Sequence, residues 1–309
     1  MKNVLITGGA GYIGSSLVQH FIRDHHVTVV DSLMYEKTSL LGYVSDKNFS
    51  FVKADVRDAS VLDPLIKKSD IIIPLAALVG FPLCDRSPRD ATEINRDVNV
   101  SLARNKSRDQ IVIYPCTNSG YGSSDSTKPC TEDSPMNPIT LYGRTKVEAE
   151  NAFRDSENCT TLRLATVFGP SPRMRTDLLV NNFVLKALRD RALVLYEDSY
   201  TRNYVHVHDV CRAFRFIVDN WDSCSNQTFN VGNDSLNCTK RELAEQICES
   251  IPAKIYVTNN VKDPDQRDYV VSSQKIYDKG FECVVGLKEG IEQMKTAYSL
   301  IDGPWYANY

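Results

Sequence analysis

The chain has 309 residues, of which 42% are hydrophobic and 24% are charged, a composition typical of globular proteins rather than of disordered or fibrous ones. The 36 basic and 39 acidic residues leave a formal net charge of −3, and no run of Lys or Arg supplies the positive patch that nucleic-acid binding needs. Because no signal-peptide pattern and no apolar stretch long enough to cross a bilayer is present, we expect a cytoplasmic protein without a membrane partner.

Short apolar runs bounded by turn residues recur through the first half of the chain. They are rich in Val and Ile and do not alternate with polar residues, as expected for strands buried on both faces; they cover residues 4–6, 27–30, 51–52, 71–73, 111–114 and 161–164. Helical patterns separate them, such as Ile13, Leu17 and Phe21 at four-residue spacing and the stretch 142–153. This alternation predicts an α/β fold with a doubly wound parallel sheet of the Rossmann type.

A glycine-rich turn, TGGAGYIG at residues 7–14, follows the first strand directly and opens a helix. In a dinucleotide-binding turn one glycine permits the tight bend, a second lets the backbone approach the pyrophosphate, and a third lets helix and strand pack closely. The amides at the start of the helix then bind the anion. We therefore predict that Gly8, Gly11, Tyr12 and Ile13 contact a dinucleotide cofactor, with Gly14 packing against the strand.

Asp31 closes the second strand, twenty residues after Gly11. A carboxylate there accepts hydrogen bonds from both ribose hydroxyls of NAD and would repel the 2′-phosphate of NADP, so NAD is the predicted cofactor; the alternative is a simple strand terminator. The remaining predicted cofactor residues follow the carboxyl ends of the second, third and fourth strands: Ser32, Asp55, Val56, Leu75, Ala76 and Ala77.

Tyr142 and Lys146 stand four residues apart on one predicted helix, so both side chains project to the same side. A tyrosine near its reference pKa of about 10 is a poor base at neutral pH, and we expect the Lys146 ammonium to lower the pKa of the Tyr142 phenol. Thr117 ends the strand that begins at residue 111 and can orient a sugar hydroxyl. Tyr142 would then take the hydroxyl proton, while Lys146 also holds the nicotinamide ribose. Both Tyr142 and Lys146 are therefore predicted cofactor contacts as well as catalytic residues.

The glycine turn, Asp31, Thr117 followed by Tyr121-Gly122, and the Tyr142–Lys146 pair together resemble the extended short-chain dehydrogenase/reductase family, sugar-nucleotide epimerase/dehydrogenase type. The resemblance covers nearly the whole chain. It implies an NAD-dependent oxidoreductase that acts on a nucleotide sugar, and a homodimer formed through the helices over residues 95–103 and 142–153.

One departure from the family pattern bears on the reaction. The 4,6-dehydratases of the family resemble Thr-Asp-Glu or Thr-Ser-Glu at this strand end, whereas Asn118 and Ser119 follow Thr117 here. Neither side chain can act as the acid or base that removal of water requires. The sequence therefore predicts oxidation or reduction, usually at carbon 4 of the sugar, or epimerisation through the same ketone, and not a 4,6-dehydratase.

The regular alternation of predicted strands and helices ends after about Ala165, where GPSP at residues 169–172 interrupts it. We predict an NAD-binding Rossmann domain over residues 1–165 and a smaller mixed nucleotide-sugar-binding region over 166–309, some of whose elements return to the main sheet. The resemblance places Arg202 and Arg267 at positions whose guanidinium groups grip the nucleotide diphosphate; alternatively they are surface or ion-paired arginines. Thr166 stands where many relatives carry a sugar-binding Asn.

Three segments, residues 78–84, 117–122 and 172–181, are similar to a bacterial branch that includes GDP-heptose 4-dehydrogenases of capsule polysaccharide biosynthesis. That branch oxidises carbon 4 of the heptose with tightly held NAD, so this resemblance implies a GDP-linked, manno-heptose-like substrate. It adds Val79, Asn118, Arg175 and Asn181 to the predicted substrate-binding residues.

Three functions stay open. A nucleotide-sugar 4-dehydrogenase leads, a 4-epimerase that retains its NAD is the alternative, and a non-catalytic NAD-binding sensor is disfavoured by the intact catalytic residues. Nine scattered cysteines without a Cys-x-x-Cys pair indicate reduced, mostly buried thiols, and His206 and His208 lack further ligands nearby, so no metal site is predicted. The capping-box sequence at residues 239–242 predicts the start of a helix.

Overall fold

The computed structural model describes residues 1–35, 38–123, 128–258 and 267–301, so the end of the predicted substrate region, residues 302–309, lies outside the described residues. A seven-stranded, wholly parallel sheet forms the larger body, with strand order β10-β6-β5-β4-β1-β2-β3. Its strands are β1 (Asn3–Thr7), β2 (His26–Asp31), β3 (Phe49–Lys53), β4 (Ile71–Pro74), β5 (Ile111–Thr117), β6 (Cys159–Leu164) and β10 (Thr228–Val231). The order reverses beside β1, as in a doubly wound sheet, so the predicted Rossmann fold is confirmed.

The sheet is buried on both faces because its apolar strands carry no polar side. On one face Ile6 and Ile113 pack with α1 (Tyr12–Phe21) and α8 (Val207–Asp219). On the other face Leu5 and Val112 pack with α2 (Ala59–Lys67), α5 (Val98–Asn105) and α6 (Leu141–Arg154). The expectation of full burial is wrong for β3, where Phe51 is 39% exposed, because β3 is the edge strand and has a neighbour on one side only.

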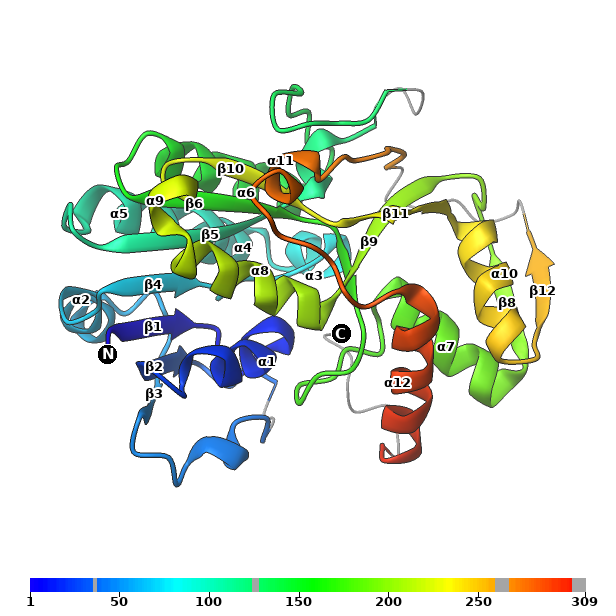
Figure 1. The fold of residues 1–309 in the computed structure, drawn as a ribbon, viewed down its shortest axis with the longest axis horizontal. Helices are drawn as coiled ribbons and strands as arrows, with labels where there is room; N and C mark the ends of the chain where they lie inside the picture. The colour runs from blue at the N-terminus through cyan, green and yellow to red at the C-terminus, as the bar shows by residue number, and fades with distance from the viewer. Residues whose placement is uncertain (36–37, 124–127, 259–266, 302–309) are drawn as a thin grey trace.

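The C-terminal region adds two small sheets and a helical layer, seen beyond β9 in Figure 1. One sheet has the order β11-β9-β7 and the other pairs β12 with β8: β7 (Thr166–Phe168), β8 (Ala192–Leu195), β9 (Thr201–His206), β11 (Asn233–Thr239) and β12 (Lys254–Val257). They pack with α7 (Leu179–Asp190), α10 (Lys240–Ser250) and α12 (Leu287–Ser299) around a second apolar core. The predicted capping box at the start of α10 is confirmed, with Thr239 and Glu242 bonding each other's backbone amides.

Short helical elements complete the described chain. They are η1 (Leu41–Tyr43), α3 (Phe81–Arg86), α4 (Pro88–Thr92), the π-helical turn η2 (Glu93–Asp97), η3 (Asn118–Tyr121), α9 (Trp221–Cys224) and α11 (Gln274–Tyr277). All nine cysteines carry free thiols, and seven of them are buried. Within the ranges that the structure describes, no group of three or more His, Cys, Asp or Glu side chains could hold a metal ion, and no helix is long and apolar enough to cross a membrane.

Candidate active site

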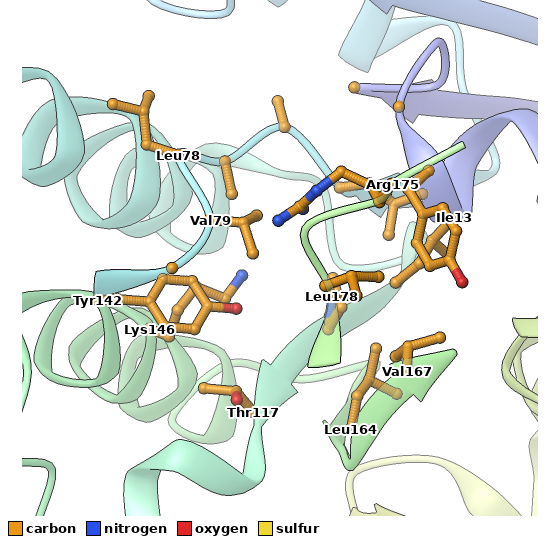
Figure 2. Close-up of a pocket in the computed structure, with 18 of the residues that line it drawn as sticks. Ile13, Leu78, Val79, Thr117, Tyr142, Lys146, Leu164, Val167, Arg175 and Leu178 are labelled. Carbon is orange, nitrogen blue, oxygen red and sulfur yellow. The ribbon is translucent and has the colours of Figure 1, made fainter. Parts of the chain in front are cut away.

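A cavity of about 580 Å³ lies at the carboxyl ends of the central strands, between the sheet and the C-terminal region. Figure 2 shows side chains from both parts of the chain converging on it. Residues after β1, β2, β3, β4 and β5 form one wall, and residues of the loop 173–179 together with Arg202, Lys240 and Arg267 form the other. A cavity at this edge is where ligands of doubly wound sheets bind.

The glycine turn is shaped by the close approach of two backbone segments. Gly8 has a φ of +69°, and a Cβ there would lie 2.5 Å from the amide nitrogen of Ala76, so only glycine fits. A Cβ on Gly14 would meet the carbonyl oxygen of Gly8 at 2.6 Å. Gly11 is the N-cap of α1, and no side chain of the described residues caps this helix. The start of α1 therefore faces the cavity with the open cradle that a dinucleotide diphosphate needs.

Asp31 lines the cavity with its carboxylate held by two backbone amides. One oxygen accepts a hydrogen bond from Ala10 N at 3.0 Å and the other from Leu33 N at 2.8 Å. Burial raises the pKa of this carboxyl, while the two backbone hydrogen bonds oppose that shift. Each oxygen keeps a further lone pair, so the fixed carboxylate can still accept hydrogen bonds from a ribose.

Thr117, Tyr142 and Lys146 meet at the same end of the cavity. Tyr142 and Lys146 project side by side from α6, and Thr117 lies at the end of β5 below them (Figure 2). Thr117 acts on the Tyr142 phenol as a hydrogen-bonding neighbour and lowers its pKa. The Lys146 ammonium lies 4.2 Å from the centroid of the buried Tyr114 ring, and Lys146 lines the cavity. The structure therefore brings the three predicted catalytic residues together at one end of the cavity.

The pKa of Tyr142 is raised, in contrast to the lowering expected from Lys146. Burial raises the pKa of Tyr142 above its usual value, and the groups that lower it are Arg267 and the hydrogen bond with Thr117. Burial also lowers the pKa of Lys146 to about 8, so its ammonium is easily discharged. Both shifts have one cause, because removal from water disfavours the charged form of each group.

A buried ion pair beneath the site holds α6 against β6. Arg163 on β6 and Glu150 on α6 are 1% exposed each and approach to 2.8 Å. Arg163 also donates to the Tyr121 hydroxyl at 3.0 Å, and that hydroxyl donates to Asn230 of β10 at 2.6 Å. The network ties Tyr121 of the recognised motif to the helix that carries Tyr142. Sequence patterns missed this pair because a charged residue on a strand or helix is usually solvent-exposed.

Most of the predicted ligand residues line the cavity. For the cofactor these are Gly8, Gly11, Tyr12, Ile13, Asp31, Ser32, Asp55, Val56, Leu75, Ala76 and Ala77, and for the substrate Val79, Thr166, Arg175, Arg202 and Arg267. Figure 2 shows Arg175 reaching into the cavity toward Val79, and its guanidinium pairs with Asp177. Arg267 donates to the Ser119 hydroxyl, beside the catalytic residues.

Two predicted substrate residues, Asn118 and Asn181, do not line the cavity. Asn181 is fully buried, accepts from Gly169 N at 3.0 Å and donates to the Arg175 carbonyl at 2.9 Å, so it holds the loop that presents Arg175. Asn118 is 1% exposed, and neither of its amide atoms has a partner among the described residues. The branch resemblance had suggested both residues as substrate contacts, and neither belongs to the residues that line the cavity.

Other cavity residues were not predicted from the sequence. The most polar of them are Arg173, Asp177, Tyr196 and Lys240. Arg173 and Asp177 lie in the segment 172–181 that carried the branch resemblance, so this segment held a usable signal. Lys240 donates to the Tyr196 carbonyl at 3.3 Å from the first residue of α10, where the capping box had indicated only a helix start.

Comparisons with known proteins agree with this geometry. A sequence model described as NAD dependent epimerase/dehydratase family matches residues 4–232. The low-salt glycan biosynthesis protein Agl12 of Haloferax volcanii is 28% identical over 96% of this chain and 98% of its own length. The UDP-glucose 4-epimerase of Mycolicibacterium smegmatis is 32% identical, covering 81% of this chain and 82% of the epimerase.

Solved structures have the same fold. DesIV, a dTDP-glucose 4,6-dehydratase of Streptomyces venezuelae with NAD bound, has a TM-score of 0.83 at 25% identity, covering 96% of this chain and 97% of that one. The UDP-glucuronic acid 4-epimerase of Bacillus cereus, in complex with UDP-glucuronic acid and NAD, also has a TM-score of 0.83, at 20% identity and over 96% of this chain and all of its own. The second likeness concerns the fold alone.

Proposed function

This chain belongs to the NAD dependent epimerase/dehydratase family, and from that premise we propose that it oxidises and reduces carbon 4 of a nucleotide-activated sugar with NAD. The observation that carries the proposal is the convergence of Thr117, Tyr142 and Lys146 in the cavity that also contains the glycine turn and Asp31. NAD fits this cavity, because the turn leaves a cradle for its diphosphate and Asp31 offers fixed acceptors to its ribose.

Residues of the chain itself transfer the proton of the sugar hydroxyl. When bound, NAD accepts the carbon-bound hydrogen of the sugar as a hydride. Thr117 orients the sugar hydroxyl, and the Tyr142 oxygen takes its proton. Arg267 places positive charge near the phenol and lowers the pKa of Tyr142. In the reverse direction Tyr142 returns the proton to the carbonyl oxygen.

The charges of the cavity favour this chemistry over 4,6-dehydration. The carboxylates among its lining residues are Asp31, Asp55 and Asp177. Asp31 and Asp55 belong to the predicted cofactor residues, and Asp177 is paired with Arg175. In the described part of the chain no acid follows Thr117, since Asn118 and Ser119 occupy those positions. We therefore propose that elimination of water lacks its acid and base here, although dehydratases occur among the family relatives.

On the substrate side we propose that Arg202 and Arg175 bind the phosphates or polar groups of the nucleotide sugar. A guanidinium offers a planar fork of donors to such oxygens. The two epimerases and the dehydratase reported above carry UDP- and dTDP-sugar names. The segments 78–84, 117–122 and 172–181, in contrast, resemble the GDP-heptose branch. We keep GDP-manno-heptose as the finer proposal, to be tested beside UDP- and dTDP-sugars.

The experiment is a panel of GDP-, UDP- and dTDP-sugars incubated with the purified protein. NADH absorbance and the configuration of the product are followed together. Net keto-sugar with formation of NADH supports a 4-dehydrogenase, whereas a changed configuration without net NADH supports a 4-epimerase. A dehydrated 6-deoxy product would contradict our proposal that the protein is not a 4,6-dehydratase. Absence of turnover with every sugar would favour a non-catalytic NAD-binding sensor.

We also propose a homodimer through η2, α5 and α6, and a cytoplasmic location. The helices that would meet carry both exposed charges, such as Arg96 and Glu148 at 3.2 Å, and partly exposed apolar residues such as Val98. Small-angle scattering of the purified protein tests the dimer: a monomeric mass would contradict it.

A further inference from the structure

The loop between β7 and α7 is joined by hydrogen bonds to the cofactor turn and the start of α1, which lie 157 to 159 residues earlier in the chain. The Tyr12 hydroxyl donates to the Gly169 carbonyl at 2.7 Å, across 157 residues of sequence. The Ser171 hydroxyl donates to the Tyr12 carbonyl at 2.6 Å, and Arg173 N donates to the Ser15 hydroxyl at 3.2 Å. These bonds fix the C-terminal loop against the first turns of α1.

The side chain of Arg173 extends from these hydrogen-bonded residues to the loop that follows β2. Its guanidinium carbon lies 5.0 Å from the centroid of the Tyr35 ring. Arg173 is 2% exposed, and both residues line the cavity together with Asp31. Arg173 also exerts a favourable electrostatic effect on the Asp31 carboxylate. A cation that faces an aromatic ring is held more strongly when it is removed from water, so this contact joins the two loops firmly.

We propose that Arg173 and Tyr35 form a clasp that closes the Asp31 end of the cavity and sets the rate at which NAD leaves. The two partners come from separate loops, Tyr35 from the loop after β2 and Arg173 from the loop between β7 and α7. A dinucleotide held between Gly11 and Asp31 leaves past this end only when the clasp parts. The proposal depends on NAD as the cofactor and not on which sugar reacts.

The clasp bears on how the protein uses its cofactor. If NAD leaves more slowly than the sugar turns over, the same NAD molecule serves oxidation and reduction, as a 4-epimerase requires. If NAD leaves quickly, reduced cofactor can be exchanged after each oxidation, as a dehydrogenase requires. A tightly closed clasp therefore favours the epimerase alternative.

The test is the dissociation rate of NADH from the full-length protein. Protein loaded with NADH is mixed rapidly with excess NAD, and the loss of NADH fluorescence gives the rate without any sugar substrate. Tyr35→Leu removes the ring face but keeps an apolar side chain, and Tyr35→Phe keeps the ring as the matched control. We expect Tyr35→Leu to release NADH at least about tenfold faster, as loss of a desolvated cation–π contact implies, and Tyr35→Phe to match the wild type.

A double-mutant cycle with Arg173→Gln separates a clasp from two independent contacts with the cofactor. If the two side chains act through each other, the double variant releases NADH no faster than the faster single variant. Multiplying effects of Arg173→Gln and Tyr35→Leu would overturn the proposal, as would equal rates for Tyr35→Leu and Tyr35→Phe. The comparison of the two Tyr35 variants decides the matter even if Arg173→Gln does not fold. Because no sugar is used, failure of the clasp leaves the proposed sugar chemistry untouched.

Discussion

Arg267 donates a hydrogen bond to the hydroxyl of Ser119, and Thr117 donates to the same hydroxyl at 2.9 Å. The guanidinium therefore sits beside the catalytic residues, although the family resemblance implied that it grips the nucleotide diphosphate. Arg267 is also one of the two groups that lower the pKa of Tyr142. From this position we propose that Arg267 is a positioning residue for the proton step.

Replacing Arg267 by Gln is expected to raise the pKa of Tyr142, because a cation that favours the phenolate is lost. The acid limb of the profile of kcat/KM against pH should move to higher pH, by roughly one unit. Arg202→Gln is the control, because we assign Arg202 to substrate binding and its guanidinium carbon lies 5.5 Å from the Tyr269 ring centroid. For this variant we expect a higher KM and an unmoved acid limb. A profile of Arg267→Gln that overlays the wild type would refute this role.

Tyr142→Phe should lower turnover by about 10²- to 10⁴-fold, because only the hydroxyl that transfers the proton is lost. NAD should remain bound, since the ring still packs in the cavity wall. Turnover and the NAD content per chain are measured on the same preparation. Tyr43→Phe is the control: its hydroxyl donates to the Ser15 carbonyl at 3.3 Å outside the cavity, and we expect unchanged turnover. Wild-type activity in Tyr142→Phe would remove Tyr142 from the mechanism.

Gly8→Ala should destabilise the protein by at least about 2 kcal/mol and abolish NAD binding, because the new methyl group needs a positive φ and meets the Ala76 backbone at 2.5 Å. Gly42→Ala provides the contrast: it adds the same methyl group where nothing lies within 4 Å. We expect its effect to stay within about 0.5 kcal/mol. Urea unfolding and fluorescence titration with NADH measure the two effects; equal stability of the two variants would contradict the account of the turn.

The buried Lys146 makes the stability of the cofactor-free protein depend on pH. Its folded pKa is about 8, below the unfolded value of 10.5, so the cost of burying the ammonium is fully present below pH 8 and disappears as the pH rises toward 10.5. Relative to Lys146→Met, the wild type should gain up to about 3 kcal/mol over that range. Urea unfolding of both proteins at a series of pH values checks this, and a constant difference would show that Lys146 titrates normally.

Local sequence patterns predicted the parts of the site that one segment builds by itself. Gly8 and Gly14 are needed because the backbone of the turn approaches itself and the end of the neighbouring strand too closely for a Cβ. The strand, turn and helix that contain these glycines have a recognisable glycine spacing in the sequence. Tyr142 and Lys146 share one helix face, so their common direction follows from the helical repeat. Thr117 ends a parallel strand, and such ends meet at the edge where ligands bind.

Other parts depend on contacts between distant segments, which a sequence pattern does not encode. Arg267 donates to Ser119, which lies 148 residues away in the sequence. Asn181 holds the loop before α7 through its hydrogen bonds with Gly169 and Arg175. The pKa of Tyr142 rises through burial that the helix pattern alone cannot reveal. Likewise, β3 is exposed because the strand order places it at the edge, and that order is a property of the whole sheet.

In the proposed reaction the sugar loses its carbon-4 hydrogen to NAD while Tyr142 takes the hydroxyl proton. The most direct measurement is kcat/KM for the nucleotide sugar identified by the panel, with either hydrogen or deuterium at carbon 4. We predict slower reaction of the deuterated sugar and deuterium on the NADH trapped from a single turnover. Turnover at the same rate for both sugars, with no deuterium ever found on the cofactor, would contradict the account.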